Sequence, residues 1–89
     1  MKTPLLLALL FVAQVPPVLD VAPKFATDPV TEDADDPAIW IHPKDPSKSL
    51  IIGTDKTEAT GGLFVFGLNG KTRQHIQGLD RPNNVDLEY

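Results

Sequence analysis

Short apolar runs of β type, separated by turn residues, fill the chain after Thr31, and none has the 3.6-residue period of an amphipathic helix. Two of the turns between these runs contain characteristic turn residues. His42 to Pro46 is a turn bracketed by prolines, and Asn69-Gly70 favours a tight hairpin because both residues tolerate positive φ. We therefore predict an all-β antiparallel meander with strands at residues 38–42, 50–54, 62–66, 72–76 and 84–89.

Strands of this length make up about one blade of a β-propeller, and they also suit a sandwich sheet or an open barrel. The chain has 89 residues and no cysteine, and removal of an N-terminal leader would leave about 65 residues. Domains near 60 residues bury only about 60% of their unfolded surface and are marginally stable without disulfides or a metal. We therefore expect the chain to be a fragment of a larger fold.

The first residues have the pattern of an export signal. Lys2 precedes an uninterrupted apolar run over residues 5–13, and Pro16-Pro17 follow it. The run is shorter than the roughly 20 apolar residues of a membrane span, which predicts a secreted or periplasmic protein without a membrane anchor. The predicted organisation is a signal peptide over 1–22 with cleavage between 13 and 26, an extended Pro-rich linker over 23–31, and an incomplete β domain over 32–89.

Charge is unevenly spread along the chain, whose formal net charge is −4 from 12 acidic and 8 basic residues. This balance disfavours attraction to nucleic acid or to an anionic membrane surface. Five acidic residues and no basic residue lie between positions 28 and 36, whereas Lys56 and Arg81 lie later. The sequence thus predicts a cation-binding site nearer the N-terminus and anion-binding groups farther along the chain.

The segment from Glu32 to Pro37 is the strongest candidate for a cation site, and we interpret it as an acidic turn that ends at a proline. Calcium takes six to eight oxygen ligands from carboxylates, carbonyls and water, and the carboxylate cluster of this turn would supply some of them. The segment is not an EF-hand loop, because the required glycine and glutamate are missing. The alternative interpretation is a solvated acidic arm before the first strand.

Two basic residues are candidates for binding phosphate. Lys56 follows the second predicted strand, where a strand end can direct its ammonium group to an anion, and Arg81 precedes the amide pair Asn83-Asn84. The alternative for both is a solvated surface charge. The sequence has no zinc-ligand spacing, no phosphate-binding P-loop and no nucleophile elbow, so nothing in it supports covalent catalysis.

Several motifs, in their order and spacing, resemble the opening of the β-propeller phytases, over roughly Thr31 to Tyr89. Asp-Asp-Pro-Ala-Ile-Trp and Asn-Asn-Val-Asp are the most specific of them. The full set is Asp35 to Pro43, Gly53 to Lys56, Gly62 to Phe66 and Asn83 to Leu87.

This resemblance implies the start of a six-bladed propeller that binds calcium ions, hydrolyses myo-inositol hexakisphosphate (phytate) with calcium-activated water, and is a monomer when complete. It implies that Asp36 is a calcium ligand through its carboxylate, that Pro37 and Val85 are ligands through their carbonyl groups, and that Asp35 lies beside them. Lys56 would hold a substrate phosphate. Arg81 would supply a second positive charge, because this chain lacks the second basic residue expected next to Lys56.

Two alternatives differ in class from an enzyme. One is a non-catalytic propeller in which calcium only stabilises a binding module, and the other is a truncated product that never folds. The remaining charged groups of the family's active site lie in blades that these 89 residues do not contain, so we expect the chain alone to be inactive.

Overall fold

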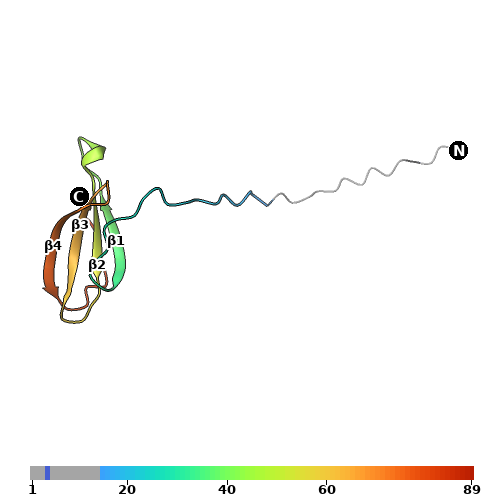
Figure 1. Ribbon diagram of the computed structural model, residues 1–89. Coiled ribbons are helices and arrows are strands. Elements are labelled where there is room, and N and C mark those ends of the chain that lie inside the picture. The colour runs from blue at the N-terminus through green and yellow to red at the C-terminus, as the bar shows by residue number, and fades with distance from the viewer. Residues whose placement is uncertain (1–3, 5–14) are drawn as a thin grey trace.

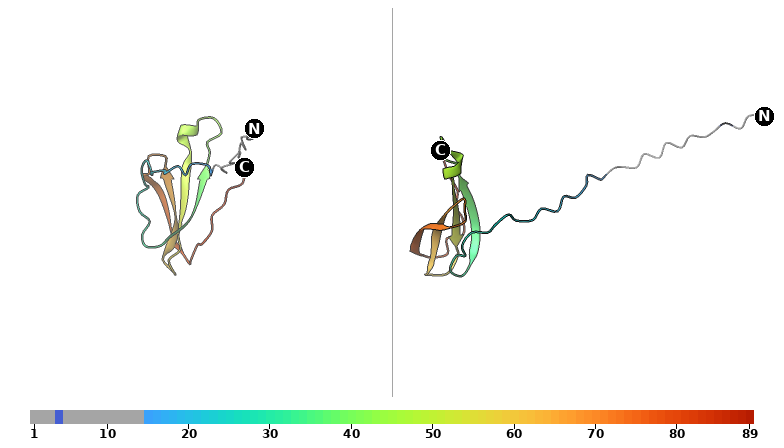
Figure 2. Two further views of the ribbon diagram at one scale, coloured as in Figure 1. Left: turned by 90° about the vertical axis from the view of Figure 1, so that its right-hand side faces the viewer. Right: turned by 45° about the horizontal axis from the view of Figure 1, so that its top comes forward.

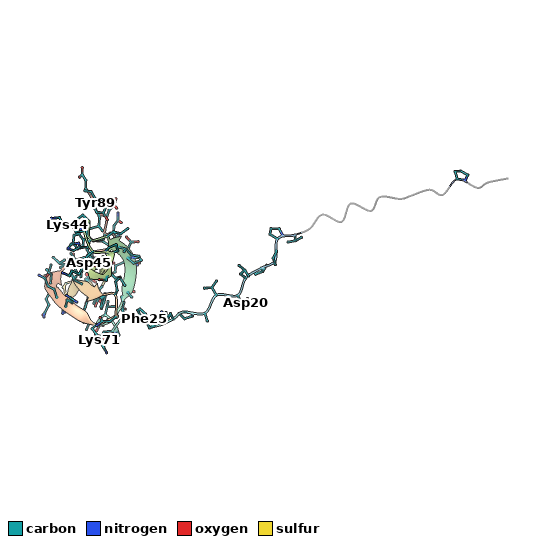
Figure 3. The ribbon with its side chains drawn as sticks, turned by 90° about the horizontal axis from the view of Figure 1, so that it is seen from above. Asp20, Phe25, Lys44, Asp45, Lys71 and Tyr89 are labelled. Atoms are coloured by element: carbon teal, nitrogen blue, oxygen red, sulfur yellow. The ribbon has the colours of Figure 1, made fainter. Side chains whose placement is uncertain are left out.

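The computed structural model describes Pro4 and residues 15–89, so most of the predicted signal peptide lies outside the described residues. Residues 15–33 contain neither helix nor strand, and the part around Asp20 extends away from the sheet (Figure 3). Among the residues that the structure describes, no helix has the length and apolar character needed to cross a membrane.

Four strands form one antiparallel sheet in the order β1-β2-β3-β4, so each strand pairs with its neighbour in the chain (Figure 1). This arrangement confirms the predicted all-β meander, and it is compatible with part of a propeller blade. The strands are β1 over Ala34–Trp40, β2 over Leu50–Asp55, β3 over Gly61–Gly67 and β4 over Thr72–Leu79.

Strand β1 begins four residues before the predicted start at Ala38 and includes Asp35 and Asp36, two of the three aspartates of the predicted acidic turn. The interpretation of residues 32–37 as a turn is therefore wrong from Ala34 onward. Polar side chains hide this part of the strand from a hydrophobic pattern, because β1 lies at the edge of the sheet. An edge position also accommodates Pro37, which has no N–H to donate, and the register shifts between Ala34 and Pro37.

The connection from β1 to β2 contains a short 3₁₀ helix, η1, over Pro46–Lys48. Asp45 caps it, because its Oδ1 accepts hydrogen bonds from the backbone N and the hydroxyl of Ser47 at 3.1 and 2.6 Å. The ring of His42 supports the turn by accepting the Asp45 N–H at 3.0 Å. The prediction of a proline-bracketed turn between two strands is confirmed.

The hairpin between β3 and β4 forms where Asn69-Gly70 predicts it, but with a different turn geometry. Gly70 N donates to Gly67 O at 2.9 Å and Gly67 N donates to Lys71 O at 3.0 Å. Gly70 has φ 81°, whereas Asn69 does not take positive φ. Both residues tolerate positive φ, but only Gly70 adopts it. The Asn69 side chain instead accepts the Lys71 N–H at 3.0 Å, and Gly70 alone takes the left-handed position of a three-residue loop.

The arm before β1 is attached to this hairpin through Asp28. Its N–H donates to Gly70 O at 2.7 Å, and its carboxylate accepts the Thr72 N–H at 2.9 Å. The hydrogen bond that the carboxylate accepts from the Thr72 N–H is the main cause that lowers the pKa of Asp28. Farther along the arm, Val30 lines a small cavity of about 230 Å³ together with Ile51 and Phe66. The arm therefore covers part of one face of the sheet.

The buried core is small and lies on β3. Phe64 and Phe66 are 6% and 2% exposed, and their rings stack with centroids 6.0 Å apart. The ring of His75 on β4 stacks on Phe64 at 3.8 Å. Trp40, which the alternation also assigns to the core, is only half-buried. Toward β1, Ile39 is more than half exposed, so apolar contact on this face is concentrated over β2 to β4.

The last ten residues turn back from the end of β4 and run beside β1 (Figure 2). The prediction of a strand at 84–89 is wrong, because this segment has no strand conformation. It contacts β1 through side chains: Val85 N donates to Asp36 Oδ2 at 3.0 Å, and the Tyr89 hydroxyl accepts the Ile41 N–H at 3.0 Å. Side-chain oxygens take the place of ladder acceptors here. Alternation of apolar residues cannot reveal that substitution.

Replacing Gly70 by alanine should detach the arm from the hairpin. A Cβ at this position would lie 2.5 Å from the carbonyl oxygen of Ala26, in addition to the strain of positive φ. Gly78 is a matched control, because its φ is 75° and its Cβ would meet nothing within 4 Å. We expect Gly78→Ala to cost about 1 kcal/mol and Gly70→Ala about 2–3 kcal/mol in urea unfolding. Equal costs would show that the arm contact contributes nothing.

Candidate functional site

The ends of β1 and β2 carry a charged cleft of about 560 Å³. Three segments build it: the arm just before β1, the turn that follows β2, and the segment after β4. Charged side chains of both signs face it, which makes it suited to a polar ligand. The residues that line it are Glu32, Asp33, Lys56, Thr57, Glu58, Arg81 and Asn83.

Lys56 lies in this cleft directly after the end of β2, as its position in the sequence predicts. Its Nζ contacts Asp35 Oδ1 at 2.9 Å, and its backbone N donates to Asp33 O at 2.8 Å. The hydrogen bond to Asp35 is the main cause that raises the pKa of Lys56, followed by the charges of Asp35 and Asp33. The ammonium group is therefore fully charged at neutral pH and, at 41% exposure, reachable by an anion.

Arg81 enters the same cleft from the other end of the sequence. Its guanidinium group contacts Glu58 at 3.0 Å, and its backbone N donates to Thr57 O at 3.2 Å. The backbone of Arg81 has φ 47°, which turns the chain back across the β2–β3 turn after β4 ends. Glu58 is therefore paired with a cation in this structure, which offsets the repulsion that its carboxylate would exert on a phosphate.

The predicted metal-binding residues lie beside the cleft, on β1 and on the C-terminal segment. Asp36 and Val85 are brought together by the 3.0 Å hydrogen bond from Val85 N to Asp36 Oδ2. The backbone of Asp36 is fixed by its N–H, which donates to the Thr54 hydroxyl at 2.9 Å. Pro37 follows on β1 and lines the smaller cavity together with Asp35 and Asp36. Asp35 also connects the predicted metal-binding residues to the cleft, because it pairs with Lys56.

The donor chemistry of this region fits calcium in part. Carboxylates and backbone carbonyls are the hard oxygen ligands that calcium prefers, and Asp35, Asp36, Pro37 and Val85 offer only such groups. Within residue 4 and residues 15–89, however, no three acidic, histidine or cysteine side chains gather as a metal-binding group. Calcium takes six to eight oxygens, so these four residues would form one side of a site.

Asp55 is the residue of this region that sequence reasoning missed. The residue is 1% exposed at the end of β2, and its carboxylate accepts the backbone N–H groups of Glu32 at 3.1 Å, Asp33 at 3.2 Å and Thr57 at 3.2 Å. The Thr57 hydroxyl donates as well. This hydroxyl is the main cause that lowers the pKa of Asp55; burial opposes it, and the backbone donors add to it. The spacing Asp-x-Thr could indicate the local turn, but only the fold brings in Glu32 and Asp33.

Together, these features define an all-β protein with a cleft lined by charged side chains of both signs, beside an acidic sheet edge. A sequence model of the family described as Phytase matches residues 10–89. The chain belongs to the phytase family.

A curated relative supports the assignment. The 3-phytase of Bacillus subtilis (strain 168) is 48% identical over 66 residues, which is 71% of this chain and 16% of that protein. The chain therefore spans about a sixth of the length of this relative. No solved structure matches significantly.

Proposed function

We propose that this chain is the N-terminal part of a longer calcium-dependent phytase, which hydrolyses the phosphomonoester bonds of phytate. The observation that carries the proposal is the cleft that Lys56 and Arg81 both line, with Lys56 paired to Asp35 on the acidic strand β1, in a chain of the phytase family. The four-stranded meander would form about one blade of a six-bladed propeller, and residues 1–22 would direct the protein out of the cytoplasm as a secreted or periplasmic enzyme.

Phosphate binding would depend on charge pairing in the cleft. Lys56 has a point charge that can contact one phosphate oxygen, and the guanidinium of Arg81 can contact two oxygens at once. Each cation is paired with a carboxylate, with Asp35 and Glu58 respectively. A phosphate group would have to replace these carboxylates as a partner, and both pairs are exposed enough for such an exchange to cost little.

The acidic residues would hold the cation side of the site. Asp36 would offer its carboxylate, Pro37 and Val85 their carbonyl groups, and Asp35 a second carboxylate, with the other ligands supplied by the rest of the protein. Bound calcium would neutralise phosphate oxygens and lower the pKa of the attacking water. The hydrogen bond from Val85 N keeps the C-terminal segment beside Asp36, so the two segments that would supply ligands lie next to each other.

The test is to measure calcium binding by calorimetry, and phosphate release from phytate with and without chelator, on the full-length protein that contains this chain. Binding of calcium together with loss of phosphate release on chelation would support the proposal. Calcium binding without phosphate release would identify a calcium-stabilised binding module instead. A protein that shows no cooperative unfolding would be a non-functional product.

A further inference from the structure

A buried carboxylate lies directly behind the cleft. Asp55 is 1% exposed and has no Lys or Arg within ion-pair distance among the described residues, so its charge is stabilised by hydrogen-bond donors alone. Burying an ionised carboxylate without such donors is costly, and each lost donor leaves part of that cost uncompensated. The positions of the donors around Asp55 are therefore constrained, because moving any one of them away would leave the buried charge less stabilised.

These donors come from two of the three segments that build the cleft. Glu32 and Asp33 belong to the arm before β1, and Thr57 belongs to the turn after β2. All three line the cleft, whereas Asp55 does not reach it. The carboxylate therefore holds these two segments of the cleft together from behind.

Lys56 lies between Asp55 and Thr57, so both of its chain neighbours belong to this hydrogen-bonded cluster. Its own N–H donates to Asp33 O at 2.8 Å. The backbone from which the ammonium group extends is thus fixed on both sides, and the same arm continues into Asp35, the ion-pair partner of Lys56. A change at Asp55 would move both ends of that ion pair relative to each other.

We infer that Asp55 is a positioning residue for phosphate binding, which acts by holding the backbone of Lys56 and the arm that bears Asp35 in one fixed geometry. The inference rests on the proposed function for the role of Lys56, but the fixed geometry itself can be measured without any substrate. Asp55 would not touch phosphate at any step.

The variants Asp55→Asn and Thr57→Val test this inference in the full-length protein. Asparagine places an amide N–H group where the carboxylate accepted a donor, and valine removes only the Thr57 hydroxyl. Thr57→Ser is the matched control, because it keeps that hydroxyl. Acylation of each lysine by an amine-reactive ester, followed by peptide mass spectrometry, reports how tightly each ammonium group is held.

We expect both variants to raise the labelling rate of Lys56 about two- to five-fold at a temperature where they remain folded, since a loosened ion pair frees the amine. Lys71, which pairs with Asp28 at 3.7 Å, should keep its rate, and Thr57→Ser should behave as the unmodified protein. Equal changes at Lys56 and Lys71, or none at Lys56, would overturn the inference, since a general loss of stability predicts no such difference.

A kinetic cycle gives the second readout. Asp55→Asn should raise KM for phytate several-fold with little change in kcat, and the same substitution should have almost no further effect on KM in a protein that already carries Lys56→Met. If Asp55→Asn raised KM by the same factor with and without Lys56→Met, the inference would be overturned. If labelling changes as expected but the unmodified protein releases no phosphate, the proposed function is wrong, and the positioning of Lys56 by Asp55 still holds.

Discussion

Replacing Asp36 by alanine should lower the rate of phosphate release from phytate by about 100-fold or more in the full-length protein, and should weaken calcium binding in parallel. The substitution would remove the carboxylate that we propose as a calcium ligand, and it removes the acceptor of the Val85 N–H, so it would release the C-terminal segment from β1. Loss of a group that orients a metal ligand typically costs about 10- to 100-fold, and we expect loss of the ligand itself to cost at least as much. Calorimetry and a phosphate-release assay measure the two effects separately.

Asp36→Asn separates the two roles of this carboxylate. The amide oxygen can still accept the Val85 N–H, whereas the negative charge is lost. If the charge matters, asparagine should be almost as damaging as alanine, and Asp45→Ala, at the opposite end of β1, should leave activity within about two-fold, since surface substitutions away from a site have small effects. Full activity of Asp36→Asn would show that Asp36 is only a hydrogen-bond acceptor.

Replacing Phe66 by alanine should have the largest effect on stability, with a loss of about 3–5 kcal/mol in the free energy of unfolding. Phe66 is 2% exposed and stacks on Phe64, and its ring lies 3.5 Å from where a Cβ on Gly53 would be. Removing the ring leaves a cavity at the centre of the sheet, beneath the arm that carries Val30. Urea unfolding followed by tryptophan fluorescence provides the measurement.

Ile39→Ala is the control for this substitution. Ile39 lies on β1 opposite Ile51 and is 59% exposed, so its removal should cost less than about 1 kcal/mol in this chain. Comparable losses at Phe66 and Ile39 would contradict the placement of the core over β2 to β4. A much larger cost at Ile39 in the full-length protein than in this chain would show that further structure covers β1 there.

The strands that could be predicted from the sequence are those in which one local rule dominates. β2 and β3 contain continuous apolar runs, and the Asn-Gly pair marks the turn that joins β3 to β4. β1 starts early because an edge strand tolerates polar residues and a proline, and neither contributes to an apolar period. Residues 84–89 have the alternation of a strand but no partner strand, because the hydroxyl of Tyr89 and the carboxylate of Asp36 make the contacts that a ladder would make.

The residues of the candidate site also fall into those that the sequence indicates and those that only the fold brings together. The place of Lys56 after a strand and the acidity of the segment before it are properties of consecutive residues, so the sequence alone was enough to identify a cation-rich and an anion-rich part. The pairing of Arg81 with Glu58, and the position of both in the same cleft as Lys56, depend on the turn of the chain after β4. No pattern along the sequence predicts that these three residues line one cleft.

The all-β meander, the main turns and the types of residue that the site could use were predictable from the sequence. These follow from short-range effects: side-chain alternation, the conformational freedom of glycine and the rigidity of proline. The role of Asp55, which is buried at a strand end and holds two segments of the cleft together, became apparent only from the folded chain. A carboxylate becomes such a fixed point when water is excluded and the donors of distant segments replace it, and that condition exists only once the chain has folded.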